Sequence, residues 1–114
     1  MNRGDIVYVN LPKQSPAGRE QFGTRPAIIV QDEPRLANLP TVIVVPLTTQ
    51  KSALRFLGAF LIALSATKGL QAESVAMCFQ IRAIDRNRIT QVIGKIDTQD
   101  LANLNLHTRK LLRL

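Results

Sequence analysis

Short β-branched runs, separated by turns rich in Pro and Gly, are the feature that most constrains the fold of this chain. Runs such as AIIV at Ala27–Val30 are too short for ordinary helices but suit strands. They recur at Asp5–Asn10, Ala27–Gln31, Thr41–Leu47, Phe56–Leu64, Glu73–Phe79 with a continuation at Ile81–Ile84, and Gln91–Ile96. Periodicity leaves a helix open for Phe56–Leu64, because the run is too short to discriminate. Six or seven short strands in 114 residues predict a small curled antiparallel sheet or β-barrel.

The C-terminal segment predicts one α-helix. Asp97 stands at the capping position, and Asp100 three residues later completes a weak capping box. Leucines at helical spacing form one apolar face, at Leu101, Leu104, Leu111 and Leu112. Asp85 predicts a capped helical turn before the last strand. The expected fold is therefore mainly β, a small curled sheet or barrel with a short helical turn and a C-terminal α-helix, in a single domain spanning residues 1–114.

Charge and composition narrow the function classes. Fifteen Lys and Arg against eight Asp and Glu give a net charge of +7, which favours RNA, DNA or an acidic protein as partner and leaves simple solubility as the alternative. Only four Phe and one Tyr are present, so an RNA-binding sheet with an aromatic base-stacking platform is not expected. Cys78 is the only cysteine, which excludes an intramolecular disulfide and a thiolate zinc site.

Targeting signals are not evident in the sequence. The N-terminus is polar, and the longest apolar stretch, LGAFLIAL at Leu57–Leu64, is far below the length of a membrane span. The expectation is a reduced, cytoplasmic protein that does not enter a membrane.

The stretch EQFGTRPAIIVQ at Glu20–Gln31 places an arginine beside an apolar strand. Pro26 is expected at the first residue of that strand, because proline cannot donate to a ladder, and it makes the preceding Arg25 extended. Gly23 supplies the freedom for a turn. Arg25 is thus either a solvated arginine at the strand entrance or a positioned contact for an anion.

Several segments, taken in order, resemble one known family. They are RGDIVYVNL at Arg3–Leu11, GREQFGTRPAIIVQ at Gly18–Gln31, VIVVPLTTQ at Val42–Gln50, GLQAESVAMCFQIRAIDRNRI at Gly69–Ile89, then IGKI and the leucine-rich helix. Together they resemble the MazF/PemK toxins of bacterial toxin–antitoxin systems over nearly the whole chain. The resemblance implies an SH3-like β-barrel with a C-terminal helix, acting as a homodimer. It further implies an endoribonuclease that cuts single-stranded RNA at short sequences without metal or other cofactor, leaving a 2′,3′-cyclic phosphate and a 5′-hydroxyl. It also implies a cognate antitoxin with an acidic tail, and contact with DNA only through the antitoxin complex.

The resemblance assigns catalytic roles to three residues. Arg25 matches the motif arginine, whose planar fork can hold two phosphate oxygens. Thr48 matches a threonine that donates to phosphate, although a hydrogen bond within its own turn is the open alternative. Glu20 is the carboxylate available as general base, with a solvated glutamate or a salt bridge to Arg25 as alternatives.

Further residues are candidates for contacts to RNA. Gln21 can read a base edge or brace its loop, and Thr49 can share the role of Thr48. Basic side chains flanking the site are expected to follow the RNA backbone, at Arg3, Lys13, Arg19, Lys51 and Arg55. Each of them is alternatively a solvated charge.

Other polar residues are assigned structural roles. His107 is expected at the surface or as a cap, and Arg82, Asp85 and Arg86 are expected to support a turn, with a dimer contact as the alternative. One branch of the family carries an arginine and an aspartate for acid–base work where this chain has Met77 and Phe79, and neither of these can transfer a proton.

Two other function classes stay open from sequence. The first is a basic barrel that binds RNA or DNA without cutting it, or that serves as a co-repressor with its antitoxin. The second is an SH3-like module for proline-rich ligands, which the scarcity of aromatic residues disfavours.

Overall fold

The computed structural model describes residues 1–12 and 23–114 of the chain. Seven strands lie in these residues: β1 (Asp5–Leu11), β2 (Gly23–Ile29), β3 (Thr41–Thr48), β4 (Ala59–Ile62), β5 (Ser74–Met77), β6 (Arg82–Asp85) and β7 (Ile89–Lys95). Four 3₁₀ turns and one α-helix join them: η1 (Lys51–Arg55), η2 (Ala66–Lys68), η3 (Cys78–Gln80), η4 (Arg86–Arg88) and α1 (Thr98–Leu112). The predicted mainly β fold with a C-terminal helix is confirmed.

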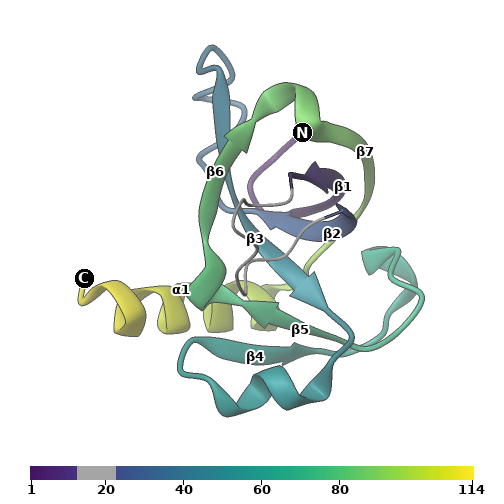
Figure 1. The fold of residues 1–114 in the computed structure, drawn as a ribbon, viewed down its shortest axis with the longest axis vertical. Helices are drawn as coiled ribbons and strands as arrows, with labels where there is room; N and C mark the ends of the chain where they lie inside the picture. Colours follow the sequence, from purple (N-terminus) through teal and green to yellow (C-terminus); the bar gives the residue numbers. More distant parts are fainter. Residues whose placement is uncertain (13–22) are drawn as a thin grey trace.

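All of the described strand pairs are antiparallel, in the order β4-β5-β3-β2-β1-β7, with β6 also paired to β3 (Figure 1). Within the described residues, no pairing joins β7 to β4 or to β6. The sheet therefore curls without closing its hydrogen-bond ladder, which refines the barrel that the sequence predicts.

Strand β3 changes partner along its length. Its first half, Thr41–Val44, pairs with β6, and its end, Leu47–Thr48, pairs with β5 (Figure 1). Pro46 lies between these two ladders, so its missing N–H falls where β3 passes from one neighbour to the other. The sequence treats β6 as a continuation of β5, but η3 separates them and directs each to a different part of β3.

Apolar side chains gather in three groups. The helix cluster lies between the sheet and α1, and consists of Ile6, Ile28, Val45, Leu47, Phe60, Ile62, Ala76, Cys78, Ile96 and Leu104. The strand cluster lies on the opposite face, and consists of Val7, Val9, Leu11, Ala27, Ile29, Val42, Val44 and Ile84. The η1 cluster consists of Ala53, Val75 and Met77, with Ala59 and Phe79 against it. Adjacent residues of β2 enter different clusters, as expected for a strand buried on both faces.

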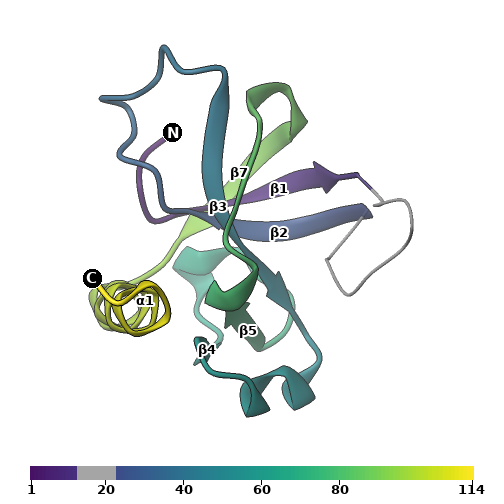
Figure 2. The ribbon, with the colours of Figure 1, turned by 60° about the vertical axis from the view of Figure 1, so that its left-hand side comes forward.

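Helix α1 follows the predicted cap. The Asp97 carboxylate accepts a hydrogen bond from the Asp100 amide at 2.8 Å, and the Asp100 carboxylate accepts one from the Asp97 amide at 3.4 Å. Leu104 is 1% exposed, and Leu101 and Leu111 pack against the helix cluster. The prediction for Leu112 is wrong: it is 49% exposed, because the last turn of α1 projects beyond β4 and β5 (Figure 1). Figure 2 looks nearly along the axis of the same helix.

The structure also decides the conformation of two segments that the sequence left open. Residues Ala59–Ile62 form an edge strand, so the helical reading of that run is wrong. Asp85 caps η4 by accepting from the Asn87 amide at 2.8 Å, as predicted. Cys78 is buried in the helix cluster, as expected for a small core residue, and burial raises the pKa of its thiol. The one α-helix of the described residues is neither long nor apolar enough to span a membrane.

Candidate functional site

Arg25 is the third residue of β2 and is exposed. The expectation that Arg25 stands at the entrance of the strand, with Pro26 as its first residue, is wrong because β2 already begins at Gly23. At this level β2 pairs with β1, through Val9 opposite Arg25, while pairing with β3 begins at Ala27. Among the described strands, Pro26 is therefore paired on one side, and proline is tolerated in such a segment. Gly23 has a φ of +83°, which fits the predicted turn.

Thr48 ends β3 and is 5% exposed. Its hydroxyl oxygen accepts a hydrogen bond from the Gln50 amide at 3.2 Å, which is the turn contact that the sequence leaves open. Accepting this bond uses a lone pair and leaves the hydroxyl proton for donation. The turn therefore orients Thr48 without consuming its capacity as a donor.

The strand register relates Arg25 to Thr48. Ala27 lies opposite Pro46 in the last pair of the β2–β3 ladder, and Arg25 and Thr48 each lie two residues beyond that pair. Both side chains belong to the face that carries the strand and η1 clusters, since Val9 is opposite Arg25 and Val75 is opposite Thr48. A guanidinium and a hydroxyl thus share one face where β2 and β3 diverge.

Arg82 is a further basic residue on this face. It lies opposite Val44, and two residues later Ile84 is opposite Val42, both within the strand cluster. The sequence assigns Arg82 only a structural role, although alternation from the buried Ile84 could have revealed its direction. Its neighbour Arg86 is structural: the Arg86 guanidinium pairs with the Glu33 carboxylate and donates to the carbonyls of Leu36 and Leu39.

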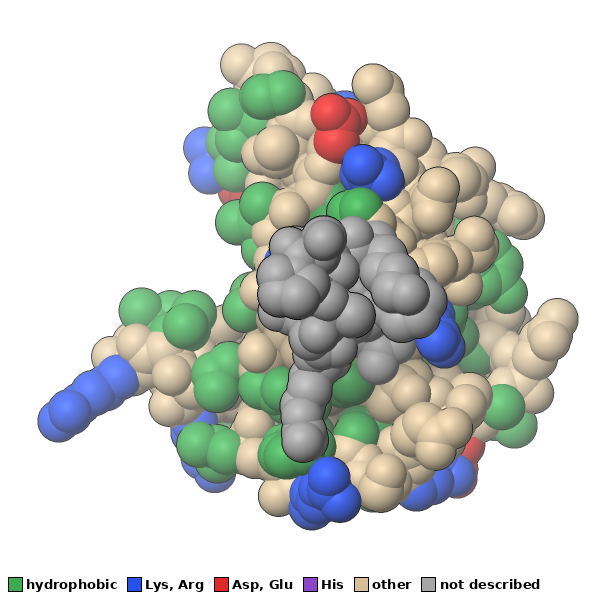
Figure 3. All heavy atoms as spheres, in the orientation of Figure 1, with side chains coloured by type: hydrophobic (Ala, Val, Ile, Leu, Met, Phe, Trp, Pro, Cys, Tyr) green, Lys and Arg blue, Asp and Glu red, His purple; other side chains and the backbone are tan. Residues whose placement is uncertain are grey.

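The segment after Thr48 carries three of the candidate RNA contacts. Thr49 is exposed, and Lys51 pairs with Glu73 at 3.0 Å between half-exposed side chains. The Arg55 guanidinium lies 4.7 Å from the centre of the Phe56 ring. Lys and Arg side chains form separate groups over the described surface rather than one patch (Figure 3). Four candidates, Lys13, Arg19, Glu20 and Gln21, lie outside the described residues.

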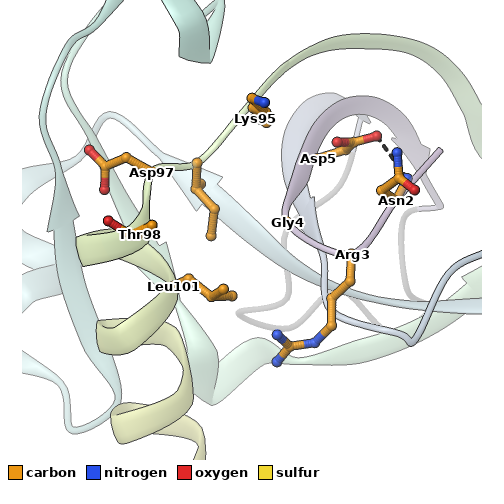
Figure 4. Close-up of a pocket in the computed structure, with 9 residues that line it drawn as sticks. Asn2, Arg3, Gly4, Asp5, Lys95, Asp97, Thr98 and Leu101 are labelled. Atoms are coloured by element: carbon orange, nitrogen blue, oxygen red, sulfur yellow. Dashed lines mark hydrogen bonds between the residues drawn. The ribbon is translucent and has the colours of Figure 1, made fainter.

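Arg3 serves the fold instead of the candidate site. Its guanidinium donates to the Val30 carbonyl at 3.0 Å and to the Asn105 side chain at 2.8 Å, so it ties the end of β2 to α1. It borders a hollow of about 240 Å³ at the start of α1, where it points toward the helix and Leu101 (Figure 4). Asp97 and Lys95 line the same hollow with opposite charges, which gives it no clear preference for an anion.

His107 departs from its predicted surface or capping role. It is half-buried, and its ring stacks on Phe60 at 5.3 Å and 9° in the helix cluster. Its Nδ1 is buried without a hydrogen-bond partner, and burial lowers the pKa of the imidazole. Within residues 1–12 and 23–114, no three His, Cys, Asp or Glu side chains converge as metal ligands would.

Comparison with known proteins gives a consistent set of relatives. A model of the PemK-like, MazF-like toxins of type II toxin–antitoxin systems matches residues 2–112. The endoribonuclease MazF9 of Mycobacterium tuberculosis is 35% identical over 112 residues, covering 92% of this chain and 90% of the relative. The endoribonuclease EndoA of Bacillus subtilis is 32% identical over 101 residues, covering 87% and 83%.

Solved structures share the fold. MazF of Deinococcus radiodurans superposes with a TM-score of 0.79 at 23% identity, over 100% of this chain and 97% of that one. A mycobacterial endoribonuclease in complex with its cognate antitoxin superposes with a TM-score of 0.76 at 18% identity, over 100% and 96%.

Proposed function

This chain belongs to the PemK-like, MazF-like toxin family of type II toxin–antitoxin systems, and on that basis we propose that it is an endoribonuclease. It cuts single-stranded RNA at short sequences, without metal or cofactor, by attack of a ribose 2′-hydroxyl on the adjacent phosphate. The observations that support the proposal are that Arg25 and Thr48 each lie two residues beyond the last pair of the β2–β3 ladder and that alternation along the strands assigns both to one face.

The reaction requires a base, an acid and donors for the charge that develops on phosphorus. The 2′-oxygen forms a bond to phosphorus as it loses its proton. The bond from phosphorus to the 5′-oxygen breaks, and that oxygen takes up a proton. The products are a 2′,3′-cyclic phosphate and a 5′-hydroxyl.

Arg25 and Thr48 supply the charge stabilisation. A guanidinium presents two parallel N–H donors to two phosphate oxygens and carries a positive charge that opposes the charge developing on phosphorus. Thr48 adds a neutral donor that its bond from the Gln50 amide already orients. Glu20, outside the described residues, is the proposed base. Met77 and Phe79 cannot act as acid, so the proton for the 5′-oxygen comes from another group or from water.

The partners follow from the family and the charge. A net charge of +7 suits RNA and equally an acidic antitoxin tail that competes for the same face. The protein acts as a cytoplasmic homodimer and reaches DNA only with its antitoxin. Gln21, Arg19, Lys13, Thr49, Lys51 and Arg55 are the proposed contacts to RNA.

The test is cleavage of a long single-stranded RNA in EDTA, with both new ends mapped. The purified protein is expected to give discrete cuts with cyclic-phosphate ends, and Arg25→Ala is expected to reduce the rate by at least ~100-fold, as loss of a charge-stabilising donor does. Arg35→Ala is the matched control, because Arg35 is an exposed arginine paired with Asp32 outside the site. If the RNA is bound but left intact, the protein is a basic RNA-binding barrel and not a nuclease.

A further inference from the structure

Two aromatic rings form a surface pair beside the candidate site. The Phe56 and Phe79 ring centres are 5.1 Å apart and tilted by 53°. Phe56 is 40% exposed, and Phe79 is half-buried against the η1 cluster. Four Phe are too few for an RRM-like sheet, but two of them meet at one place on the surface.

The ring pair lies on the face that holds Thr48. Val75 is opposite Thr48 and belongs to the η1 cluster, on which Phe79 packs. Phe56 immediately follows η1, which begins three residues after Thr48. The rings therefore share a face with Thr48 but lie toward the other end of β5, since Thr48 pairs near the start of that strand and Phe79 follows its end.

Basic groups accompany the rings. The Arg55 guanidinium lies 4.7 Å from the centre of the Phe56 ring, which is within range for a cation–π contact. Lys51 begins the same 3₁₀ turn and is half-exposed. Figure 3 shows hydrophobic side chains and Lys or Arg side chains together along the lower edge of the molecule, over η1 and β4.

We propose that Phe56, Phe79 and Arg55 form a stacking subsite for one unpaired nucleobase of the bound RNA, on the face that holds Thr48. Exposed aromatic rings with adjacent cations are the combination by which proteins hold single-stranded nucleic acid. This inference rests on the proposed RNA substrate and extends it to a residue that selects the base.

Binding is measured first, to labelled 2′-O-methyl oligonucleotides of uridine and of adenosine, which cannot be cut. Phe79→Leu removes the ring and keeps an apolar side chain, and Phe79→Tyr keeps the ring. Phe79→Leu is expected to bind about 5- to 150-fold more weakly, since stacking of one base on an aromatic ring contributes that much, whereas Phe79→Tyr stays within about twofold. Leu106→Ala is the control, because Leu106 is a similarly exposed apolar residue on α1.

Cleavage of a long unmodified RNA is measured next, with cut sites counted by sequence. Phe79→Leu is expected to raise KM, to leave kcat within a few fold and to lose base preference at one position beside the cut, which a merely structural change would not do. Phe56→Leu is expected to change KM, kcat and base preference in the same way, and it tests the subsite if Phe79→Leu does not fold. Wild-type affinity and base preference in both leucine variants would overturn the subsite. Absence of cleavage by the wild type, with ring-dependent binding retained, would overturn the nuclease alone.

Discussion

Charged side chains have different environments and roles in two regions of this molecule. At the base of α1 and beneath the turn at η4, Lys68 and Glu33 are buried inside ion pairs with Asp100 and Arg86. On the candidate site face, Arg25 and the basic residues of η1 are exposed. A buried pair positions segments of the chain, because a charge left alone there is costly, whereas exposed charged side chains remain in contact with solvent.

The buried ion pairs of Lys68 stabilise the place where two segments of the chain come into contact. Its ammonium donates to the Ala63 carbonyl at 2.9 Å and pairs with the carboxylates of Asp100 at 2.8 Å and Asp97 at 3.3 Å. A Cβ on Gly94 would lie 2.3 Å from the Lys68 backbone, so the two segments touch there and only glycine fits. Burial by itself favours a neutral amine, but the hydrogen bonds to Asp100 and Asp97 outweigh it and raise the pKa of Lys68.

The largest expected effect comes from breaking this buried pair. Lys68→Met leaves the Asp100 carboxylate buried without its cation and is expected to lower the free energy of unfolding by about 3–5 kcal/mol. Urea titration followed by circular dichroism measures it. Lys51→Met, which breaks an ion pair with Glu73 between half-exposed side chains, is the control and is expected to cost less than ~1 kcal/mol. Equal losses of unfolding free energy in both variants would contradict the difference between the buried and the exposed ion pairs.

The next largest effect is expected at Arg25 and depends on the planar geometry of its guanidinium. Arg25→Lys keeps the positive charge and loses the planar fork, so RNA cleavage is expected to fall by about 100-fold while stability changes little. Initial rates and thermal unfolding of the same preparation measure the two quantities. Near-normal rates with lysine would reduce the role of Arg25 to that of a simple point charge.

A pH titration probes the Glu33–Arg86 pair. The hydrogen bond from Arg86, against the opposing effect of burial, holds the pKa of Glu33 below its ordinary value of 4.5. A lowered folded-state pKa gives stability that is present above 4.5 and lost as the pH falls through the folded-state pKa.

Glu33→Gln is therefore expected to flatten the decline of stability below about pH 4.5, by at most ~1.4 kcal/mol per pH unit for one proton. Urea unfolding between about pH 3 and pH 6 measures it. Asp32→Asn, in an exposed pair with Arg35, is the control. Parallel curves for wild type and Glu33→Gln would show that this carboxylate does not govern acid stability.

The smallest effect is expected from a single phosphate contact. Lys51→Ala should reduce the slope of log affinity for single-stranded RNA against log salt by about 0.7, the value for one phosphate contact. Fluorescence anisotropy over a range of salt concentrations measures it, with Arg35→Ala as the unaffected control. An unchanged slope would show that Lys51 is a solvated charge that does not contact a phosphate.

Local patterns predicted much of the fold. The capping box at Asp97, the turn at Asp85 and the β-branched runs each depend on neighbours a few residues away, so the sequence displays them directly. The errors lie where distant segments decide. Pro26 is inside β2 because β1 pairs with it there, and the end of α1 leaves Leu112 exposed.

The candidate site was predicted in part. The family resemblance indicated Arg25 and Thr48, and their roles stay predictions that the mutants above test. The sequence could not separate Arg3, which braces α1, from Arg82, which lies on the candidate face, because both are arginines beside apolar strands.

The sequence by itself determined the family, the strand-rich composition and the capped helix, since these rest on motifs and local propensity. Only the tertiary structure decided which residues share a face. That choice depends on the antiparallel register of β2 against β3 and on the point where β3 exchanges β6 for β5. A shift of one residue in either register would turn Thr48 or Arg25 to the opposite face, and the local pattern of side chains along each strand would be unchanged.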